Sequence, residues 1–205
     1  MSAKRSNAST TRRARSKQSN PTTQLKILSS KTVFKGRVFA VTRDRVQEPN
    51  GVTAIREVIR HSGSVVVLAV DDSGAEPRVL LERQYRYAAR DYMLELPAGR
   101  IDPGEDPLAA GKRELQEETG YAASRWKQAL FFYPSPGFVE ETMTVFLARG
   151  LKAGKAQPED DERIELEFVP LSRVVKLILS GKIRDGKTIA GVLWFQESVR
   201  ARDKE

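Results

Sequence analysis

The chain has 205 residues, of which 40% are hydrophobic and 30% charged, as expected for one globular domain or a domain with an appendage. No stretch approaches the roughly 18 consecutive apolar residues of a membrane-spanning helix. The lack of cysteine excludes disulfide scaffolds, thiolate metal sites and cysteine nucleophiles. We therefore expect a cytoplasmic protein with no membrane partner and no secretory signal.

Positive charge is concentrated near the N-terminus. Eleven of the 35 Lys and Arg residues precede the first acidic residue, Asp44, which leaves 24 basic and 27 acidic residues from there onward. The net charge of +8 therefore belongs to the first stretch, and nucleic acid is not expected as a partner. Residues 1–24 have almost no core-forming side chains and are predicted to be a disordered basic tail. A solubilising arm, a weak polyanion-binding segment and an organelle transit peptide all fit this tail.

Residues 25–60 are predicted to form a small antiparallel β segment. β-Branched residues are frequent there, and Gly36 and the run Pro49-Asn50-Gly51 mark turns. So few strands cannot bury a core alone. We expect the segment to pack on the main domain or on another subunit.

Strands and helices interleave in the main domain, residues 61–205. The apolar run SVVVLAVDD predicts a central strand that pairs with RVLLERQYR. A helix is predicted over 107–119, because Asp106 suits the N-cap, Pro107 the first turn and Gly120 a left-handed stop. Further strands are predicted at WKQALFFY, ETMTVFLARG and IELEFVP, and further helices at LSRVVKLILSG and KTIAGVLWFQESVRAR. This order predicts an α/β fold with a mixed sheet flanked by helices.

Three carboxylates share one face of the helix predicted over 107–119. With an advance of about 100° per residue, Glu114, Glu117 and Glu118 point one way. Arg113 lies one turn before Glu117, a spacing that predicts an ion pair between them. Such crowding of like charges is unfavourable unless a cation lies among the oxygens, and hard oxygen donors suit Mg²⁺ or Mn²⁺. A solvated acidic helix face is the alternative.

The stretch from Gly99 to Tyr121 resembles the Nudix box. That motif has a glycine, five residues, Glu, seven residues, and then Arg-Glu-hydrophobic-any-Glu-Glu-any-Gly-hydrophobic. The matching residues are Gly99, Glu105, Arg113, Glu114, Leu115, Glu117, Glu118, Gly120 and Tyr121. The resemblance implies an α/β/α sandwich and Mg²⁺-dependent hydrolysis of a nucleoside diphosphate linked to another group. It also implies that Glu114, Glu118 and the backbone carbonyl of Ala98 bind the metal, with Glu117 close by in a catalytic role.

Flanking segments resemble the ADP-ribose pyrophosphatase branch, namely REVIRHSGSVVVLAV, LLERQYR, LELPAG and FYPSPGFVEE. This resemblance covers roughly residues 55–195 and implies a homodimer with exchanged N-terminal strands. It implies that Arg56, Glu57 and Arg60 reach the adenine and phosphates, that Arg86 grips the phosphates or the distal ribose, and that Ser135 contacts substrate. Alternating charges on the outer face of a strand are the alternative for Glu57, Arg60 and Arg86.

In that branch the general base comes from a late acidic loop, here within QPEDDERIELEFV. The comparison favours Glu162 as the catalytic base, with Glu165 as the second choice and a solvated loop as the remaining alternative. The expected reaction cleaves ADP-ribose to AMP and ribose 5-phosphate. Two other functions stay open, a pyrophosphatase for GDP-mannose-like or UDP-glucose-like nucleotide sugars and a ligand-sensing module that does not hydrolyse.

Overall fold

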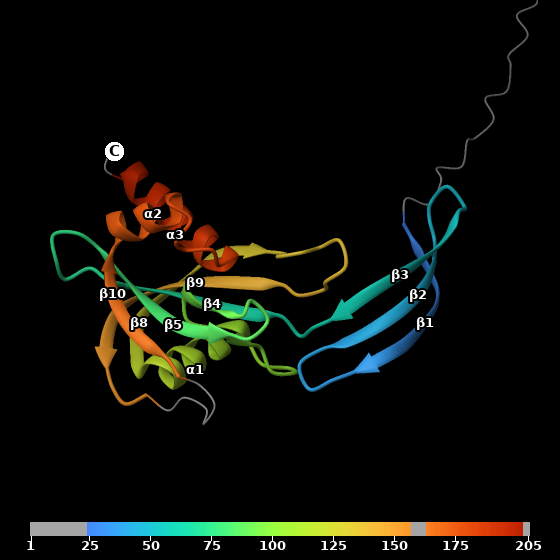
Figure 1. The fold of residues 1–205 in the computed structure, drawn as a ribbon, viewed down its shortest axis with the longest axis horizontal. Helices are drawn as coiled ribbons and strands as arrows, with labels where there is room; N and C mark the ends of the chain where they lie inside the picture. The colour runs from blue at the N-terminus through green and yellow to red at the C-terminus, as the bar shows by residue number, and fades with distance from the viewer. Residues whose placement is uncertain (1–23, 157–162, 203–205) are drawn as a thin grey trace, which may run out of the picture.

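The computed structural model describes residues 24–156 and 163–202 (Figure 1). A three-stranded sheet extends from a larger body that has helices on both sides of a second sheet. The strands are β1 (Lys26–Lys35), β2 (Ala40–Gln47), β3 (Thr53–Arg60), β4 (Ser64–Asp71), β5 (Arg78–Arg86), β6 (Asp91–Glu95), β7 (Ala98–Arg100), β8 (Tyr121–Phe132), β9 (Met143–Ala153) and β10 (Glu165–Pro170), and the helices are α1 (Pro107–Thr119), α2 (Leu171–Leu179) and α3 (Gly186–Arg202). The basic tail predicted for 1–24 lies outside the described residues except for its last position.

The larger sheet is mixed and has the order β10-β5-β4-β9-β8, with β6 paired to β5 and β7 to β4. Strands β4 and β9 run parallel, and the other pairs are antiparallel. Helix α1 covers one face, and α2 and α3 cover the other (Figure 1). The predicted α/β/α sandwich is therefore confirmed, and β4 pairs with β5 as expected.

The hydrophobic core lies on both faces of β4, which explains its continuous apolar sequence. Val66 packs in the cluster that contains Val174 of α2, whereas Val67 packs in the cluster that contains Leu115 of α1. All four side chains have 0% exposure. Strand β4 is thus a rigid centre from which neighbouring strands position the residues of the groove described below.

Helix α1 begins and ends where its sequence predicts. The side chain of Asp106 accepts hydrogen bonds from the backbone N–H groups of Leu108 and Ala109 over 3.0 and 3.1 Å. Gly120 adopts φ 73°, a left-handed conformation that favours glycine. These caps fix the register of the helix and hence the direction of its glutamates.

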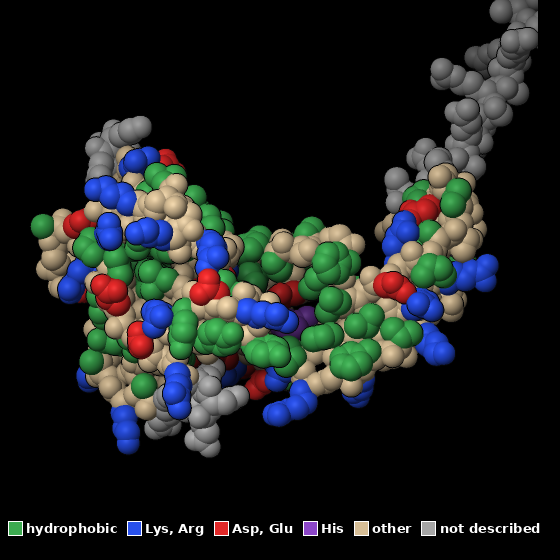
Figure 2. Space-filling view, in the orientation of Figure 1, with side chains coloured by type: hydrophobic (Ala, Val, Ile, Leu, Met, Phe, Trp, Pro, Cys, Tyr) green, Lys and Arg blue, Asp and Glu red, His purple; other side chains and the backbone are tan. Residues whose placement is uncertain are grey.

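The N-terminal sheet has the order β1-β2-β3 and leaves many apolar side chains uncovered. Every residue of β1 is exposed, and hydrophobic side chains are visible along the sheet (Figure 2). It joins the body at the end of β3, where the N–H of Ile59 donates to the carbonyl of Phe138 and the N–H of Glu140 donates to the carbonyl of Ile59. It also joins the body between β1 and β2, where the carbonyl of Arg37 accepts from Arg100 of β7 over 2.9 Å. Among the residues described here, no helix has the length and apolar character needed to cross a membrane.

Candidate active site

A groove of about 700 Å³ lies beside the N-terminal end of β4 and is lined by charged side chains. Its acidic residues are Asp102, Glu114, Glu118 and Glu141, and its basic residues are Arg37, Arg86, Arg100, Arg113 and Lys187. Ala98 and Gly99 of β7 form part of its wall. The structure therefore brings together six residues that the sequence analysis singled out, namely Arg86, Ala98, Gly99, Arg113, Glu114 and Glu118.

Glycine at position 99 makes room for a carboxylate. A Cβ added to Gly99 would lie 1.9 Å from Cδ of Glu114 and 2.0 Å from its Oε1. The carboxylate of Glu114 thus rests directly against the backbone of β7. Glu118, one turn later on α1, accepts a hydrogen bond from the N–H of Ala98 over 3.1 Å and is 5% exposed. These two contacts explain why the motif needs a glycine on the strand and glutamates on the helix.

Arg113 ties the motif's carboxylates together. Its guanidinium donates to Glu105 over 3.0 Å, to Glu114 over 2.7 Å and to Glu117 over 3.1 Å. The predicted contact between Arg113 and Glu117 is therefore confirmed. The hydrogen bond to Glu105 is the largest cause that raises the pKa of Arg113, and the same bond, with one from the N–H of Asp102, lowers the pKa of Glu105.

The groove offers oxygen ligands that suit a hard divalent cation, although these ligands are not close enough together to form a complete coordination site. Glu114, Glu118 and the backbone of Ala98 face one groove, and the cradle at Gly99 holds a carboxylate where a side chain would otherwise stand. Within residues 24–156 and 163–202, no three acidic or imidazole groups are close enough to hold a metal ion. One carboxylate oxygen of Glu114 instead accepts a hydrogen bond from Arg113. Glu117 is 44% exposed and is not part of the groove wall.

Two basic residues of the groove share one buried carboxylate. Nε of Arg86 donates to Oε1 of Glu95 over 2.7 Å, and Nζ of Lys187 donates to Oε2 of the same residue. Burial lowers the pKa of Arg86, but the hydrogen bond and charge of Glu95 outweigh it, with smaller help from Glu82 and Glu118, so that the pKa is raised. Lys187 was not predicted, because a single lysine near the start of a helix carries no motif.

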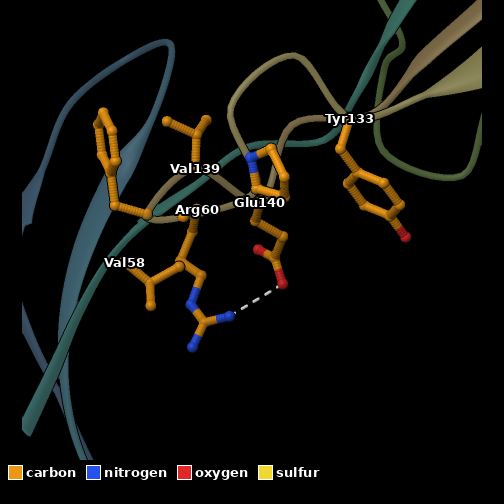
Figure 3. Close-up of a pocket in the computed structure, with 8 residues that line it drawn as sticks. Val58, Arg60, Tyr133, Val139 and Glu140 are labelled. Atoms are coloured by element: carbon orange, nitrogen blue, oxygen red, sulfur yellow. Dashed lines mark hydrogen bonds and ion pairs between the residues drawn. The ribbon is translucent and has the colours of Figure 1, made fainter.

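A second, smaller pocket of about 290 Å³ lies between the end of β3 and the loop after β8 (Figure 3). Its wall consists mainly of apolar groups from Val58, Tyr133, Pro136, Gly137, Phe138 and Val139. The charged residues Arg60 and Glu140 complete the wall, and Arg60 donates a hydrogen bond to Glu140 over 2.9 Å. Arg60 also binds the buried Asp44 of β2 over 2.5 Å.

The pocket and the groove are neighbours along two segments of the chain. Arg60 lines the pocket and Ser64 the groove, while Glu140 lines the pocket and Glu141 the groove. The hydroxyl of Ser64 donates to Glu141 over 2.6 Å. The sequence analysis missed Glu141, although it is the last residue of the quoted segment FYPSPGFVEE.

The remaining predicted residues lie elsewhere. Arg56 pairs with Glu48, and Glu57 with Arg43 across the antiparallel strands, so neither lines the groove or the pocket of its own chain. The carbonyl of Ser135 accepts from the N–H of Val139 over 3.0 Å, which places Ser135 in the turn beside the pocket. Glu165 belongs to β10, is 75% exposed, and pairs with Arg83. Glu162 lies outside the described residues.

Comparison with known protein families identifies the class to which this fold and groove belong. Residues 60–192 match the NUDIX domain, and residues 25–59 match the nucleoside diphosphate sugar hydrolase N-terminal domain. The chain belongs to the Nudix family, whose hydrolases generally depend on divalent metal ions. The resemblance drawn from the box is therefore confirmed.

Particular relatives refine this placement. The ADP-ribose pyrophosphatase of Bacillus subtilis (strain 168) is 36% identical over 173 residues, 83% of this chain and 92% of the relative. The ADP-ribose pyrophosphatase of Mycobacterium tuberculosis is 38% identical over 169 residues, 81% of this chain and 80% of the relative. A GDP-mannose pyrophosphatase of Salmonella paratyphi B is 34% identical over 159 residues, 69% of this chain and 81% of the relative.

A solved structure shares the fold. The crystal structure of an ADP compounds hydrolase superposes with a TM-score of 0.77 at 23% sequence identity, and the match covers 90% of this chain and 98% of that one. Because the match includes most of both chains, the N-terminal sheet and the sandwich recur together.

Proposed function

We propose that this protein hydrolyses the diphosphate bond of ADP-ribose and releases AMP and ribose 5-phosphate. The observation that carries the proposal is the junction of an apolar pocket with a charged groove, which suits a ligand with a flat base at one end and a diphosphate beside it. The relatives named as ADP-ribose pyrophosphatases support the same substrate.

The apolar pocket is the proposed site of the nucleobase. Val58, Phe138 and Val139 offer non-polar surface to a planar ring, and Arg60 and Glu140 offer a donor and an acceptor at its edge. A carboxylate can accept from the exocyclic amino group of adenine. A base held there would extend its phosphates along Ser64 and Glu141 into the groove.

The groove is the proposed site of hydrolysis. Glu114, Glu118 and the carbonyl of Ala98 would hold Mg²⁺ or Mn²⁺, which neutralises diphosphate charge and acidifies water when bound. Arg113 orients the carboxylate of Glu114, and Arg86 offers a guanidinium to phosphate oxygens. Retention of these groove carboxylates argues against a sensing module that does not hydrolyse.

Two carboxylates are candidates for the general base. Glu162 remains the proposal from sequence resemblance, and Glu141 is a carboxylate that lines the groove and is fixed by Ser64. Glu162→Gln should lower kcat far more than it weakens binding of a non-hydrolysable ADP-ribose analogue. If Glu141→Gln has that effect and Glu162→Gln does not, the base is Glu141. Glu165, the second choice from the resemblance, pairs with Arg83 and does not line the groove, so Glu165→Gln should keep normal turnover and serves as the internal control. If Glu165→Gln alone lowers kcat, the base is Glu165.

We also propose a homodimer in which the N-terminal sheets are exchanged, in a cytoplasmic setting. Ile27, Phe34 and Ile55 are 64%, 52% and 54% exposed in one chain, a large apolar surface for a monomer. A second copy that covers this surface could also carry Arg56 and Glu57 toward a neighbouring pocket. Light scattering at micromolar concentration tests the proposal, and a fully active monomer would overturn it.

A substrate screen tests the central proposal. ADP-ribose, GDP-mannose and UDP-glucose would be incubated with the protein and either Mg²⁺ or Mn²⁺, and the products separated by ion-exchange chromatography. We expect AMP and ribose 5-phosphate to form with the highest kcat/KM. A higher kcat/KM for GDP-mannose would instead favour the second candidate function, which the Salmonella relative supports.

A further inference from the structure

A buried glutamate binds two cations at the wall of the groove. Glu95, the last residue of β6, is 1% exposed and accepts a hydrogen bond on each carboxylate oxygen, one from Arg86 and one from Lys187. Both cationic side chains line the groove. One carboxylate therefore fixes two groove cations that come from β5 and α3.

The first turn of α3 is attached to the same strand end, which restricts Lys187. The N–H of Leu96 donates to Oγ1 of Thr188 over 2.8 Å, and that hydroxyl donates to Asp185 over 2.6 Å. Asp185 lies 3.1 Å from Nζ of Lys187. Lysine usually keeps its ammonium group in water, yet Lys187 is only 8% exposed. The position of the Lys187 ammonium group is therefore fixed by its contacts with Glu95 and Asp185.

The two cations suit an anionic ligand with several oxygens. Nε is the nitrogen of Arg86 that binds Glu95, and a guanidinium bound in this way presents its terminal nitrogens to other acceptors. A guanidinium fork matches two oxygens of one phosphate, and an ammonium group acts as a point charge beside it. The pair is thus complementary to a diphosphate rather than to a neutral sugar or a base.

We propose that Arg86 and Lys187 form a two-cation clamp for the diphosphate–ribose end of the substrate, that Lys187 contacts the substrate directly, and that Glu95 is the positioning residue of the clamp. The inference rests on the proposed function, because the apolar pocket must hold the base for the clamp to meet the phosphates. Lys187 and Glu95 then affect binding of the diphosphate–ribose end of the ligand and not binding of its nucleobase.

Binding measurements on the full chain test the clamp. Titration calorimetry with Mg²⁺ would compare an α,β-methylene analogue of ADP-ribose with adenosine, which lacks phosphates. Lys187→Met should weaken binding of the analogue by about tenfold or more, the loss expected for a charge-assisted contact, and leave adenosine binding within about twofold. Lys187→Arg, which keeps the charge, should recover part of the loss. Glu95→Gln should also weaken binding of the analogue selectively.

Arg184→Met is the matched control. Arg184 forms an ion pair with Asp91, so it joins the approach to α3 with β6 as Lys187 does, but it is not part of the groove wall. We expect this variant to bind both ligands normally. Unchanged binding of the analogue by a folded Lys187→Met protein, or an equal loss for adenosine, would overturn the clamp. If the unmodified protein neither binds nor cleaves any nucleoside diphosphate, the proposed function fails first, and with it the clamp.

Discussion

Replacing Gly99 with alanine tests whether the position of one carboxylate controls the reaction. The new Cβ would lie 1.9 Å from Cδ of Glu114, whereas real Cβ contacts stay beyond 3.0 Å, so one of the two groups must move by about 1.1 Å. Strand β7 is paired with β4 through Val65 and cannot move easily, whereas the end of a glutamate side chain can. We therefore expect the carboxylate to leave its cradle while the fold persists.

A misplacement of about 1 Å in a catalytic group costs on the order of a hundredfold in rate. The Gly99→Ala variant should accordingly lose about a hundredfold in kcat for ADP-ribose and keep a melting temperature within a few degrees of the unmodified protein. Steady-state kinetics and thermal unfolding measure the two quantities. Gly74→Ala is the control, because a Cβ there would meet its nearest atom at 3.7 Å, an ordinary contact. Normal turnover by Gly99→Ala would refute the reasoning, and so would a large loss of stability.

Other substitutions probe the proposed metal site, the stability of a turn and the start of α1. Glu114→Gln and Glu118→Gln should each lower kcat by at least about a hundredfold, or roughly 2.7 kcal/mol, in steady-state assays of correctly folded protein. Hydrogen bonds from Ser73, and then Arg78, lower the pKa of Asp71 from 3.8 to about 2, so the charged form stabilises the fold above pH 4 and this contribution is lost as the pH falls toward 2. The stability advantage over Asp71→Asn, measured by urea unfolding, should shrink over that interval and not above it. Asp106→Ala removes the N-cap of α1 and should lower the free energy of unfolding by about 1 kcal/mol.

Local patterns predicted the helix and its charged face well. The limits of α1 follow from Asp106, Pro107 and Gly120, which act within one turn of the helix. The ion pair between Arg113 and Glu117 follows from helical spacing alone. A continuous run of apolar residues likewise placed the central strand, because burial on both faces leaves a direct trace in the sequence.

Contacts between distant segments could not be predicted in this way. Lys187 and Glu95 are 92 residues apart, and Ser64 and Glu141 are 77 apart, so only the packing of the sandwich brings them together. The cross-strand pair of Glu57 with Arg43 also depends on the register of β2 against β3, which cannot be read from the sequence alone. In one chain this pair fits the simpler expectation of alternating charges on an outer strand face.

The different burial of the two sheets divides the molecule into parts that open at different free energies. Residues 65–70 of β4 are fully buried, and β7, which carries the backbone of Ala98 and Gly99, is hydrogen-bonded to that strand. Every residue of β1 is exposed. Amide protons of β1 in a single chain should therefore exchange with solvent through small local openings, while those of β4 exchange only when the whole domain unfolds. The wall of the groove proposed to hold the metal is thus built on the last part of the molecule to open, so the proposed catalytic geometry would outlast partial unfolding of the surface proposed to form the dimer.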